Sequence, residues 1–343
     1  MATNQELLEN LWSSNDITKL ARFYSLNPSI NGLVKFSRNR PKAEIIIHKK
    51  RWAKSPVVVV VPTTDANGTL ARNVTSIFSP LPIVFAQSNG RYFNYGRSLN
   101  AGISEALNAD PTWVIIANDD LIHVGNTYTL VELLEDITNA EVVLAKPSQH
   151  GSAWQHSALL SIEKNSKISD LMWSLLWSFM HTSLSAQLIS SLVEKRYGLQ
   201  YQIAPIPESI LQNRSLLGLD RQRTYYLFHS IHARKTGIYF RNFSAFGAFR
   251  SSILARERFD ETFINGYEDT DFSFRLWLQK RKVVIANYKI AHLGGYSLSR
   301  SRKAMSIRIM HEVFNKLYFS FKNRNLIREA MSSAKETDAP SHT

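Results

Sequence analysis

The stretch "SPVVVVVPTTDANG", residues 55–68, contains five consecutive valines at positions 57–61. An unbroken β-branched run of this kind is typical of a strand that is buried on both faces, as in a parallel sheet. Helical patterns and further apolar runs alternate after it, which predicts an α/β domain with a mostly parallel, Rossmann-like sheet flanked by helices. Ligands of such sheets bind at the carboxyl ends of the strands. The further strands are predicted in "PIVFAQSNG" at 82–90, "PTWVIIANDD" at 111–120 and "EVVLAKP" at 141–147.

The composition restricts the chemistry of the chain. Lys and Arg number 41 against 28 Asp and Glu in 343 residues, a net charge of +13. This excess favours phosphates, polyanions or an anionic membrane surface as neighbours. The chain has no cysteine, which excludes disulfides, thiolate metal sites and cysteine nucleophiles and leaves oxygen and imidazole as metal ligands.

The beginning of the sequence, "MATNQELLENLWSS", lacks the basic and apolar segments of a secretory signal, so we expect a cytoplasmic protein. The apolar stretch at 171–193 is interrupted by Ser, Thr, His and Gln, whereas a membrane span needs about 20 mostly apolar residues. We therefore predict no transmembrane helix.

The alternation of strands and helices is interrupted between residues 151 and 235. A Trp-rich stretch with helical character and a basic run at 221–235 predict a helical insertion there. Strand patterns return in 237–250 and 282–297. The chain then continues into a predicted basic helix at 300–328, and its last dozen residues are predicted to be disordered. Ile307, Met310, Phe314, Leu317 and Phe321 form an apolar stripe on that helix.

The motif "NDD", Asn118 to Asp120, directly follows a predicted buried strand. Adjacent carboxylates repel one another unless a cation or solvent offsets their charge, and oxygen ligands suit Mg2+ or Mn2+ bound jointly with substrate phosphates. The alternative is a plain turn, because Asn and Asp favour turns after strands.

The stretch "FINGYEDTDFSFRLW", residues 263–277, places Glu268, Asp269 and Asp271 within four positions at the start of a predicted helix. Carboxylates at a helix start are stabilised by the helix dipole, so a structural cluster is the alternative to a catalytic one. His292, in "IAHLGGYS" after another predicted strand, is either structural or completes a metal or diphosphate site.

The order of these pieces resembles glycosyltransferase family 2, which has a GT-A-type fold, and most of all its rhamnosyltransferase-like members. The resemblance covers about 57–145 and 240–298. It implies an inverting, divalent-metal-dependent transferase that moves a hexosyl or deoxyhexosyl group from a nucleoside-diphosphate sugar to an acceptor hydroxyl. The motifs that carry it are "VVVVVPTTDAN", "NYGRSLNAGISEA", "WVIIANDD", "FGAFR", "FDETFINGYEDTDFSFRL" and "IAHLGGYS".

The resemblance also implies roles for individual residues. Asp269 is implied as the catalytic base, with Glu268 and Asp271 beside it, and Asp120 and His292 are implied to hold Mn2+ or Mg2+. Two positions depart from the family pattern, namely "AQSNG" at the end of the second strand and Asn118 in place of an acid. The residues implied to hold the nucleotide sugar are Pro62, Thr63, Asp65, Gln87, Asn89, Arg97, Asn100 and Asp119.

These expectations divide the chain into five segments. They are an N-terminal helical and basic extension at 1–56, a nucleotide-sugar-binding half at 57–150, the insertion at 151–235, an acceptor or catalytic half at 236–298, and a C-terminal basic helix with its tail at 299–343.

Three other functions stay open. The basic stretches fit a non-catalytic nucleic-acid-binding protein, or a phage-type glycosyltransferase that modifies DNA, and a similar fold serves nucleotidyltransferases. For a glycosyltransferase, the acceptor is a glycan, a lipid-linked glycan or a nucleic acid. Trp154, Trp173 and Trp177, with the cationic helix at 300–328, either form a peripheral contact with an anionic membrane surface or pack on the core.

Overall fold

The computed structural model describes residues 4–27, 29–146, 154–163, 223–230, 238–292 and 302–337. The chain divides into two compact units. The first, called here the sheet unit, comprises Pro41–Gln155 and Arg241–Ser297. The second, called the helical unit, comprises Met1–Arg40, His156–Phe240 and Leu298–Thr343.

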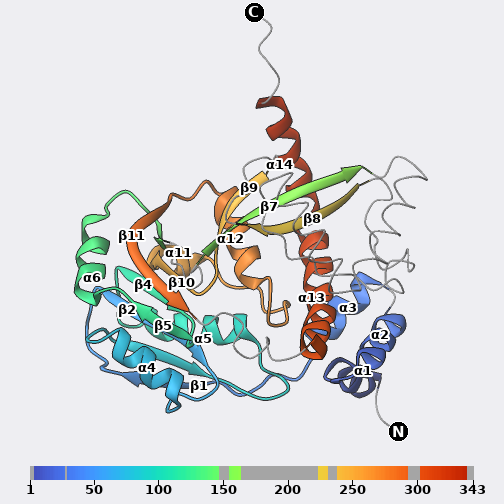
Figure 1. The fold of residues 1–343 in the computed structure, drawn as a ribbon, viewed down its shortest axis with the longest axis horizontal. Coiled ribbons are helices and arrows are strands. Elements are labelled where there is room, and N and C mark those ends of the chain that lie inside the picture. The colour runs from blue at the N-terminus through green and yellow to red at the C-terminus, as the bar shows by residue number, and fades with distance from the viewer. Residues whose placement is uncertain are drawn as a thin grey trace, which may run out of the picture. The chain divides into compact units, whose positions relative to one another are not determined.

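The sheet unit is built on an eight-stranded sheet with the strand order β1-β3-β2-β4-β10-β6-β11-β5 (Figure 1). Strands β2, β3, β4, β6 and β11 run in one direction, and β1, β5 and β10 run in the other. The strands are β1 (Ile46–Lys50), β2 (Val57–Thr63), β3 (Ile83–Gln87), β4 (Trp113–Ala117), β5 (Leu121–Val124), β6 (Val142–Lys146), β10 (Phe246–Arg250) and β11 (Val283–His292).

The run of five valines lies at the centre of this sheet. Strand β2 pairs in parallel with β3 on one side and β4 on the other, and all seven of its residues are buried. Burial on both faces is the reason why an unbroken apolar run predicts this strand. The predicted Rossmann-like α/β sheet, in which most strands share one direction, is confirmed. Strand β10 interrupts it, because it lies antiparallel between β4 and β6.

Helices connect the strands of the sheet unit. Helix α5 begins after Asn94, whose side chain accepts the backbone N–H of Arg97 as an N-cap. It packs closely on β2, because a Cβ added at Gly102 would lie 2.6 Å from Val60 Cγ1. The helices are α4 (Thr69–Ile77), α5 (Tyr95–Leu107), α6 (Thr127–Asp136), α11 (Ser251–Arg256) and α12 (Glu268–Leu278).

The N-terminal extension contains the predicted short helices α1 (Asn4–Trp12), α2 (Ile17–Leu26) and α3 (Ile30–Arg38). Part of its basic stretch is ordered. Arg40 forms a buried ion pair with Glu9 at 2.8 Å, and β1 extends the sheet by pairing antiparallel with β3.

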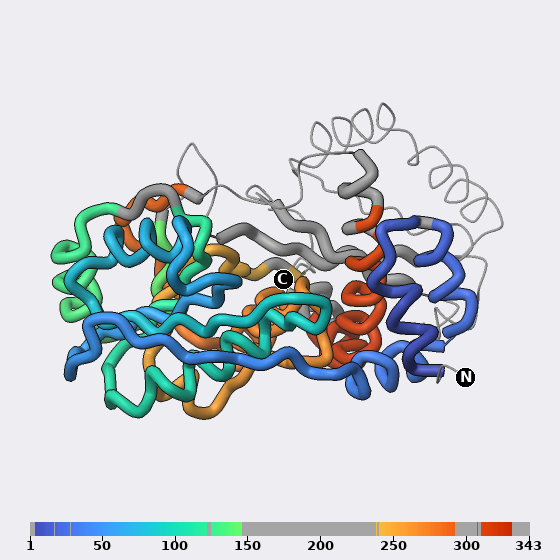
Figure 2. Tube along the Cα trace, turned by 90° about the horizontal axis from the view of Figure 1, so that it is seen from below, coloured from blue at the N-terminus to red at the C-terminus, as the bar shows by residue number. Residues whose placement is uncertain are grey.

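Helix α13 (Arg302–Lys322) packs on these N-terminal helices, and Figure 2 shows its red trace beside their blue one. The Trp12 ring lies 4.5 Å from the ring of His311 and 5.9 Å from that of Phe314. The Tyr24 hydroxyl donates a hydrogen bond to the Met310 carbonyl at 2.5 Å. These contacts bury part of the predicted apolar stripe: Met310, Phe314 and Leu317 are buried, whereas Phe321 is exposed.

The C-terminal prediction needs two corrections. The basic segment is two helices, because α13 ends at Lys322 and α14 (Arg324–Thr337) begins after the buried Asn323. The helix also continues to Thr337, well into the dozen residues predicted to be disordered. Their many charged and polar residues predict disorder, but Ala, Glu, Met and Lys are good helix formers.

The insertion is not helical at its ends. Strands β7 (Trp154–Glu163) and β8 (Arg223–Ser230) pair antiparallel and form a three-stranded sheet with β9 (Ile238–Phe243). The sequences "WQHSALLSIE" and "RTYYLFHS" carry aromatic and β-branched residues, which favour strands. The helical prediction depends on the stretch at 171–193, which lies outside the described residues together with Trp173 and Trp177. No helix among the described residues is both long enough and apolar enough to cross a membrane.

Candidate active site

Polar side chains meet where the parallel strands end. Strands β2 and β4 run in the same direction, so Thr63 and the residues after Ala117 lie at one edge of the sheet. The Thr63 hydroxyl donates a hydrogen bond to Asp119 Oδ2 at 2.8 Å. This bond fixes the loop after β4 to the end of β2, as expected for a ligand site at the carboxyl ends of strands.

The two adjacent acids at this edge, Asp119 and Asp120, are half-buried. Burial raises the pKa of Asp119 above its usual value, and the negative charge of Asp120 raises it further. The hydrogen bond from Thr63 lowers this pKa and so offsets part of the increase. Asp120 Oδ1 is buried, and no described group donates a hydrogen bond to it. A buried carboxylate oxygen of this kind calls for a cation or an ordered donor.

His292 ends β11 at the same edge. In the pairing of β11 with β5, Ala291 lies opposite His123 and His292 lies opposite Leu121, with an irregular register between the two pairs. The backbone of His292 is therefore opposite the residue that follows Asp120. Within the part of the chain that the structure describes, no group of three or more His, Asp or Glu side chains forms a metal site.

The acidic cluster begins helix α12, as the sequence predicts. Tyr267, the residue before the helix, is buried and has a φ of 69°, a left-handed conformation that is unusual for an aromatic residue. Such strain gathers at functional sites. Glu268 Oε2 accepts the backbone N–H of Gly266 at 2.7 Å. Burial and the charge of Asp269 raise the pKa of Glu268 to about 8.

The three acids of this cluster lie in different environments. Glu268 and Asp271 are buried, whereas Asp269 is half-buried. Asp269 Oδ1 accepts the backbone N–H of Thr270 at 2.7 Å and lies 3.3 Å from the Thr270 hydroxyl. Asp269 is therefore the acid of the cluster that a solvent-borne group can reach.

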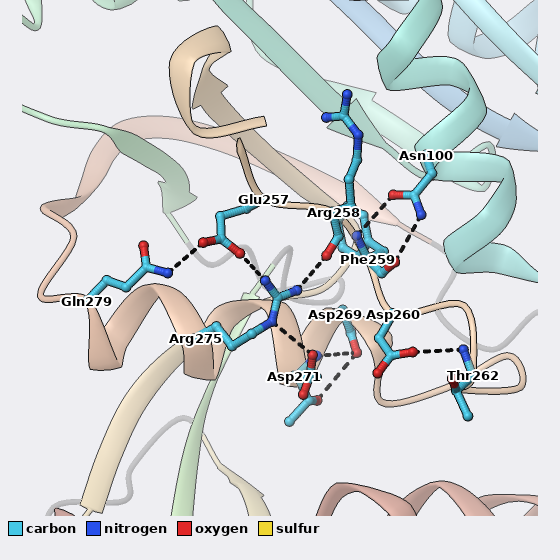
Figure 3. A network of polar contacts seen from close by, with 11 residues as sticks. Asn100, Glu257, Arg258, Phe259, Asp260, Thr262, Asp269, Asp271, Arg275 and Gln279 are labelled. Atoms are coloured by element: carbon cyan, nitrogen blue, oxygen red, sulfur yellow. Dashed lines mark hydrogen bonds and ion pairs between the residues drawn. The ribbon is translucent and has the colours of Figure 1, made fainter. Parts of the chain in front are cut away.

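Asp271 belongs to a network within the protein (Figure 3). Its carboxylate pairs with Arg275 Nε at 3.1 Å. The Arg275 guanidinium also pairs with Glu257 and donates a hydrogen bond to the Arg258 carbonyl at 2.6 Å. Asp271 thus helps to hold α12 against the segment before it, a structural contact that the expectation of a catalytic role did not include.

Tyr95 lies between the two groups of acids, and the sequence analysis missed it. Its hydroxyl donates a hydrogen bond to Asn118 Oδ1 at 2.5 Å, and its backbone N–H donates to Asn265 Oδ1 at 3.0 Å. Burial raises the pKa of the phenol well above its usual value, and four negative charges add to this effect, those of Glu268, Asp269, Asp119 and Asp120. The acids of "NDD" and of "YEDTD" are therefore neighbours in the folded protein.

The residues implied for the nucleotide occupy the ends of β2 and β3. Pro62 is buried within β2, and Asp65 is exposed in the turn that follows. Gln87 Oε1 accepts the backbone N–H of Ala66 at 2.8 Å, which joins the two strand ends. Asn89 is exposed in the loop after β3. The structure thus brings these residues to the same edge as the acids.

Arg97 and Asn100, on α5, already contact the protein. Arg97 Nη1 donates a hydrogen bond to the Ala43 carbonyl at 2.6 Å. The Asn100 amide accepts the Phe259 N–H at 2.9 Å and donates to the Phe259 carbonyl at 2.9 Å (Figure 3). It also donates to Glu261 Oε1 at 3.0 Å. The Asn100 side chain therefore joins α5 to the loop that precedes α12.

Comparisons with known proteins add little to this site. No family model matches the chain, and no curated protein matches it significantly. Among solved structures it is similar to S. aureus TarS 1–349, with a TM-score of 0.34 and 14% sequence identity over 78% of this chain and 73% of that one. A likeness at this TM-score carries no argument about function.

Proposed function

We propose that this protein is an inverting glycosyltransferase of the GT-A type that uses a nucleoside-diphosphate sugar and Mn2+ or Mg2+. The observation that carries this proposal is the meeting of two acidic motifs around Tyr95, one after β4 and one at the start of α12. One motif suits a metal-bound diphosphate, and the other suits a base for the acceptor.

Asp269 takes the acceptor proton in this proposal. It is the half-buried acid of its cluster, so its carboxylate can meet an acceptor hydroxyl. Its neighbour Glu268, with a pKa raised to about 8, carries a proton at neutral pH and does not compete as a base. Different environments for two neighbouring carboxyls are a common way to divide their roles.

In this proposal the sugar is transferred in a single displacement step. The acceptor hydroxyl gives its proton to Asp269 while its oxygen forms a bond to the anomeric carbon of the sugar. The bond between that carbon and the diphosphate breaks on the opposite face, and the nucleoside diphosphate leaves. Direct attack through an oxocarbenium-like transition state inverts the anomeric configuration.

Asp120 is the residue that we propose for the metal, with His292 close by. The supporting observation is the buried Oδ1 of Asp120, which no described group satisfies. A divalent cation bound there would offset the charge of the leaving diphosphate. We propose Pro62, Thr63, Asp65, Gln87, Asn89, Arg97 and Asp119 for contact with the nucleotide sugar, and Asn100 for holding α5 in place beside it.

The net charge of the chain bears on the acceptor and on the location of the protein. The net charge of +13 favours an anionic acceptor or surroundings, such as a lipid-linked glycan at the inner face of a membrane, a glycan or a nucleic acid. A cytoplasmic enzyme in glycan or polysaccharide synthesis fits each of these acceptors.

A screen of nucleoside diphosphate release across UDP, GDP and dTDP sugars with Mn2+ tests the proposal. We expect release with one nucleotide class, and release slower by about 100-fold or more with the Asp269→Asn variant. Release of pyrophosphate instead would indicate a nucleotidyltransferase. Steeply salt-dependent binding of nucleic acid, without turnover of any donor, would favour a binding protein.

A further inference from the structure

The side chain of Asn118 is held in one orientation at the edge of the acidic site. Its backbone N–H donates a hydrogen bond to the Ala245 carbonyl at 2.9 Å, which fixes the main chain after β4. Its Oδ1 accepts the hydrogen bond from the Tyr95 hydroxyl at 2.5 Å. Asn118 is therefore held by its backbone N–H and by its side-chain oxygen.

This orientation decides what Asn118 offers to a ligand. An Asn amide has one oxygen, which accepts, and one nitrogen, which donates two hydrogen bonds. Because Oδ1 faces the phenol, Nδ2 faces the other way. No group among the described residues accepts a hydrogen bond from Nδ2, and the side chain is half-buried rather than enclosed. Two N–H donors are left for solvent or ligand.

Tyr95 is itself held in place. Its backbone N–H is bound by Asn265 Oδ1 at 3.0 Å, and Asn265 Nδ2 donates to the Phe93 carbonyl at 3.3 Å. The next residue, Gly96, lies so close to the start of α12 that an added Cβ would be 3.6 Å from Glu268 Cβ. The backbone that carries the Tyr95 phenol is therefore held in place between the two acidic motifs.

We propose that Tyr95 fixes Asn118 as a hydrogen-bond donor to an oxygen of the bound nucleotide sugar, and not as a ligand of the metal. This inference rests on the proposed function. The oxygen is the atom with which an amide binds Mg2+ or Mn2+, and here it accepts the hydrogen bond from the phenol. The nitrogen is neutral and donates, which suits a phosphate or hydroxyl oxygen among carboxylates that would repel it.

The accepting oxygen belongs either to the diphosphate or to the sugar, and two sets of probes separate these sources. Isothermal titration calorimetry in EDTA measures binding of UDP, GDP and dTDP, and then of UDP-glucose, GDP-mannose and dTDP-rhamnose. Equal losses of affinity for both sets would indicate a diphosphate oxygen, and a loss of affinity only for the sugar esters would indicate a sugar hydroxyl.

The variants are Asn118→Ala, Asn118→Asp, Tyr95→Phe and the double variant of Asn118→Ala with Tyr95→Phe. Tyr128→Phe is the matched control, because the Tyr128 side chain is 65% exposed.

The Asn118→Ala variant should weaken binding about 10-fold or more, because it removes a hydrogen bond to a charged or polar oxygen. Asn118→Asp keeps the shape and the acceptor for Tyr95 but has no N–H, so it should weaken binding at least as much. Tyr95→Phe should also weaken binding, and the double variant should be no worse than Asn118→Ala, because Tyr95 acts through Asn118. Tyr128→Phe should bind like the wild type.

Two results would overturn this inference alone while the wild type binds normally. One is wild-type affinity of Asn118→Asp in EDTA, which would show that the N–H donors are not used. The other is additive loss from Asn118→Ala and Tyr95→Phe, which would show that Tyr95 acts independently. Absence of binding by the wild type to every probe, both in EDTA and with Mn2+ present, would overturn the proposed function together with this inference.

Discussion

The Glu268 carboxylate folds back over the start of its own helix and accepts the backbone N–H of Gly266 at 2.7 Å. The residue between them, Tyr267, makes this possible by taking a left-handed conformation. Glu268 is thereby buried, while the next acid in the chain, Asp269, stays half-buried. One backbone turn therefore gives two adjacent carboxyls different burial and different access to an acceptor.

Asp269→Asn is the sharpest test of the proposed base. The change keeps the shape and the hydrogen bond to Thr270 but removes the basic lone pair, so turnover should fall about 100-fold or more. Donor binding should survive, and the free energy of unfolding should change by at most about 1 kcal/mol. Turnover with the true acceptor, calorimetric donor binding and thermal unfolding measure the three quantities. A stable variant with wild-type turnover would refute the assignment.

Asp271→Asn should behave in the opposite way. It removes a fully buried charge that pairs with Arg275, and breaking a buried pair costs about 3 kcal/mol of unfolding free energy. Urea denaturation should show this loss, while the variant that remains folded should keep much of its turnover. A stable Asp271→Asn variant with abolished turnover would restore a catalytic role for this acid.

Glu268 should make stability fall as pH rises. Its pKa is raised from 4.5 to about 8 in the folded protein, so between these values the folded state holds a proton that the unfolded chain has released. The stabilising contribution of Glu268 is fully present below pH 4.5 and is lost toward pH 8. Between these values the free energy of unfolding falls by at most about 1.4 kcal/mol per pH unit. Thermal unfolding at pH 5, 6.5 and 8 should show wild type losing stability relative to Glu268→Gln. Parallel curves would contradict the raised pKa.

Asp120→Ala should abolish the response to metal without harming the fold. Removing a buried carboxylate oxygen that no described group satisfies relieves a desolvation cost, so thermal stability in EDTA should be unchanged or higher. In the wild type, Mn2+ with a nucleoside diphosphate should raise the Tm, and EDTA should stop transfer. The exposed Asp136, changed to Ala, is the control and should keep both responses. Full transfer by the wild type in EDTA would remove the metal from the proposal.

Asn100→Ala should reduce stability more than donor affinity. The side chain makes three hydrogen bonds to the loop at 259–261, and losing them should cost about 2–3 kcal/mol of unfolding free energy. Urea denaturation and donor titration separate the two effects. A large loss of donor affinity in a variant of normal stability would instead favour the direct role implied by the resemblance.

Much of the sheet could be predicted from the sequence, because strands buried on both faces leave apolar runs that stand out. The central β2 is the clearest case. The position of β10 could not be predicted in this way. The sequence "FGAFR" indicates a strand, but its antiparallel place between β4 and β6 depends on pairing with residues more than a hundred positions away.

The acidic motifs could be located because each falls at the end of a strand or the start of a helix. The role of Tyr95 could not, since its partners Asn118 and Asn265 are 23 and 170 positions away in the chain. A tyrosine in the first turn of a helix carries no pattern that indicates such contacts. Asp271 shows the converse, because a motif groups it with Asp269 while the fold buries it against Arg275.

The central place of β10 also affects how the chain is made. Strands β4 and β6 emerge from the ribosome first, and each must wait for residues 246–250 to fill the space between them. During that interval both strands present open edges, which are the surfaces on which nascent chains aggregate. A chain cut short before residue 246 would keep these edges permanently, so expression of residues 1–245 alone should yield aggregates, even though this segment contains the most apolar strands of the sheet.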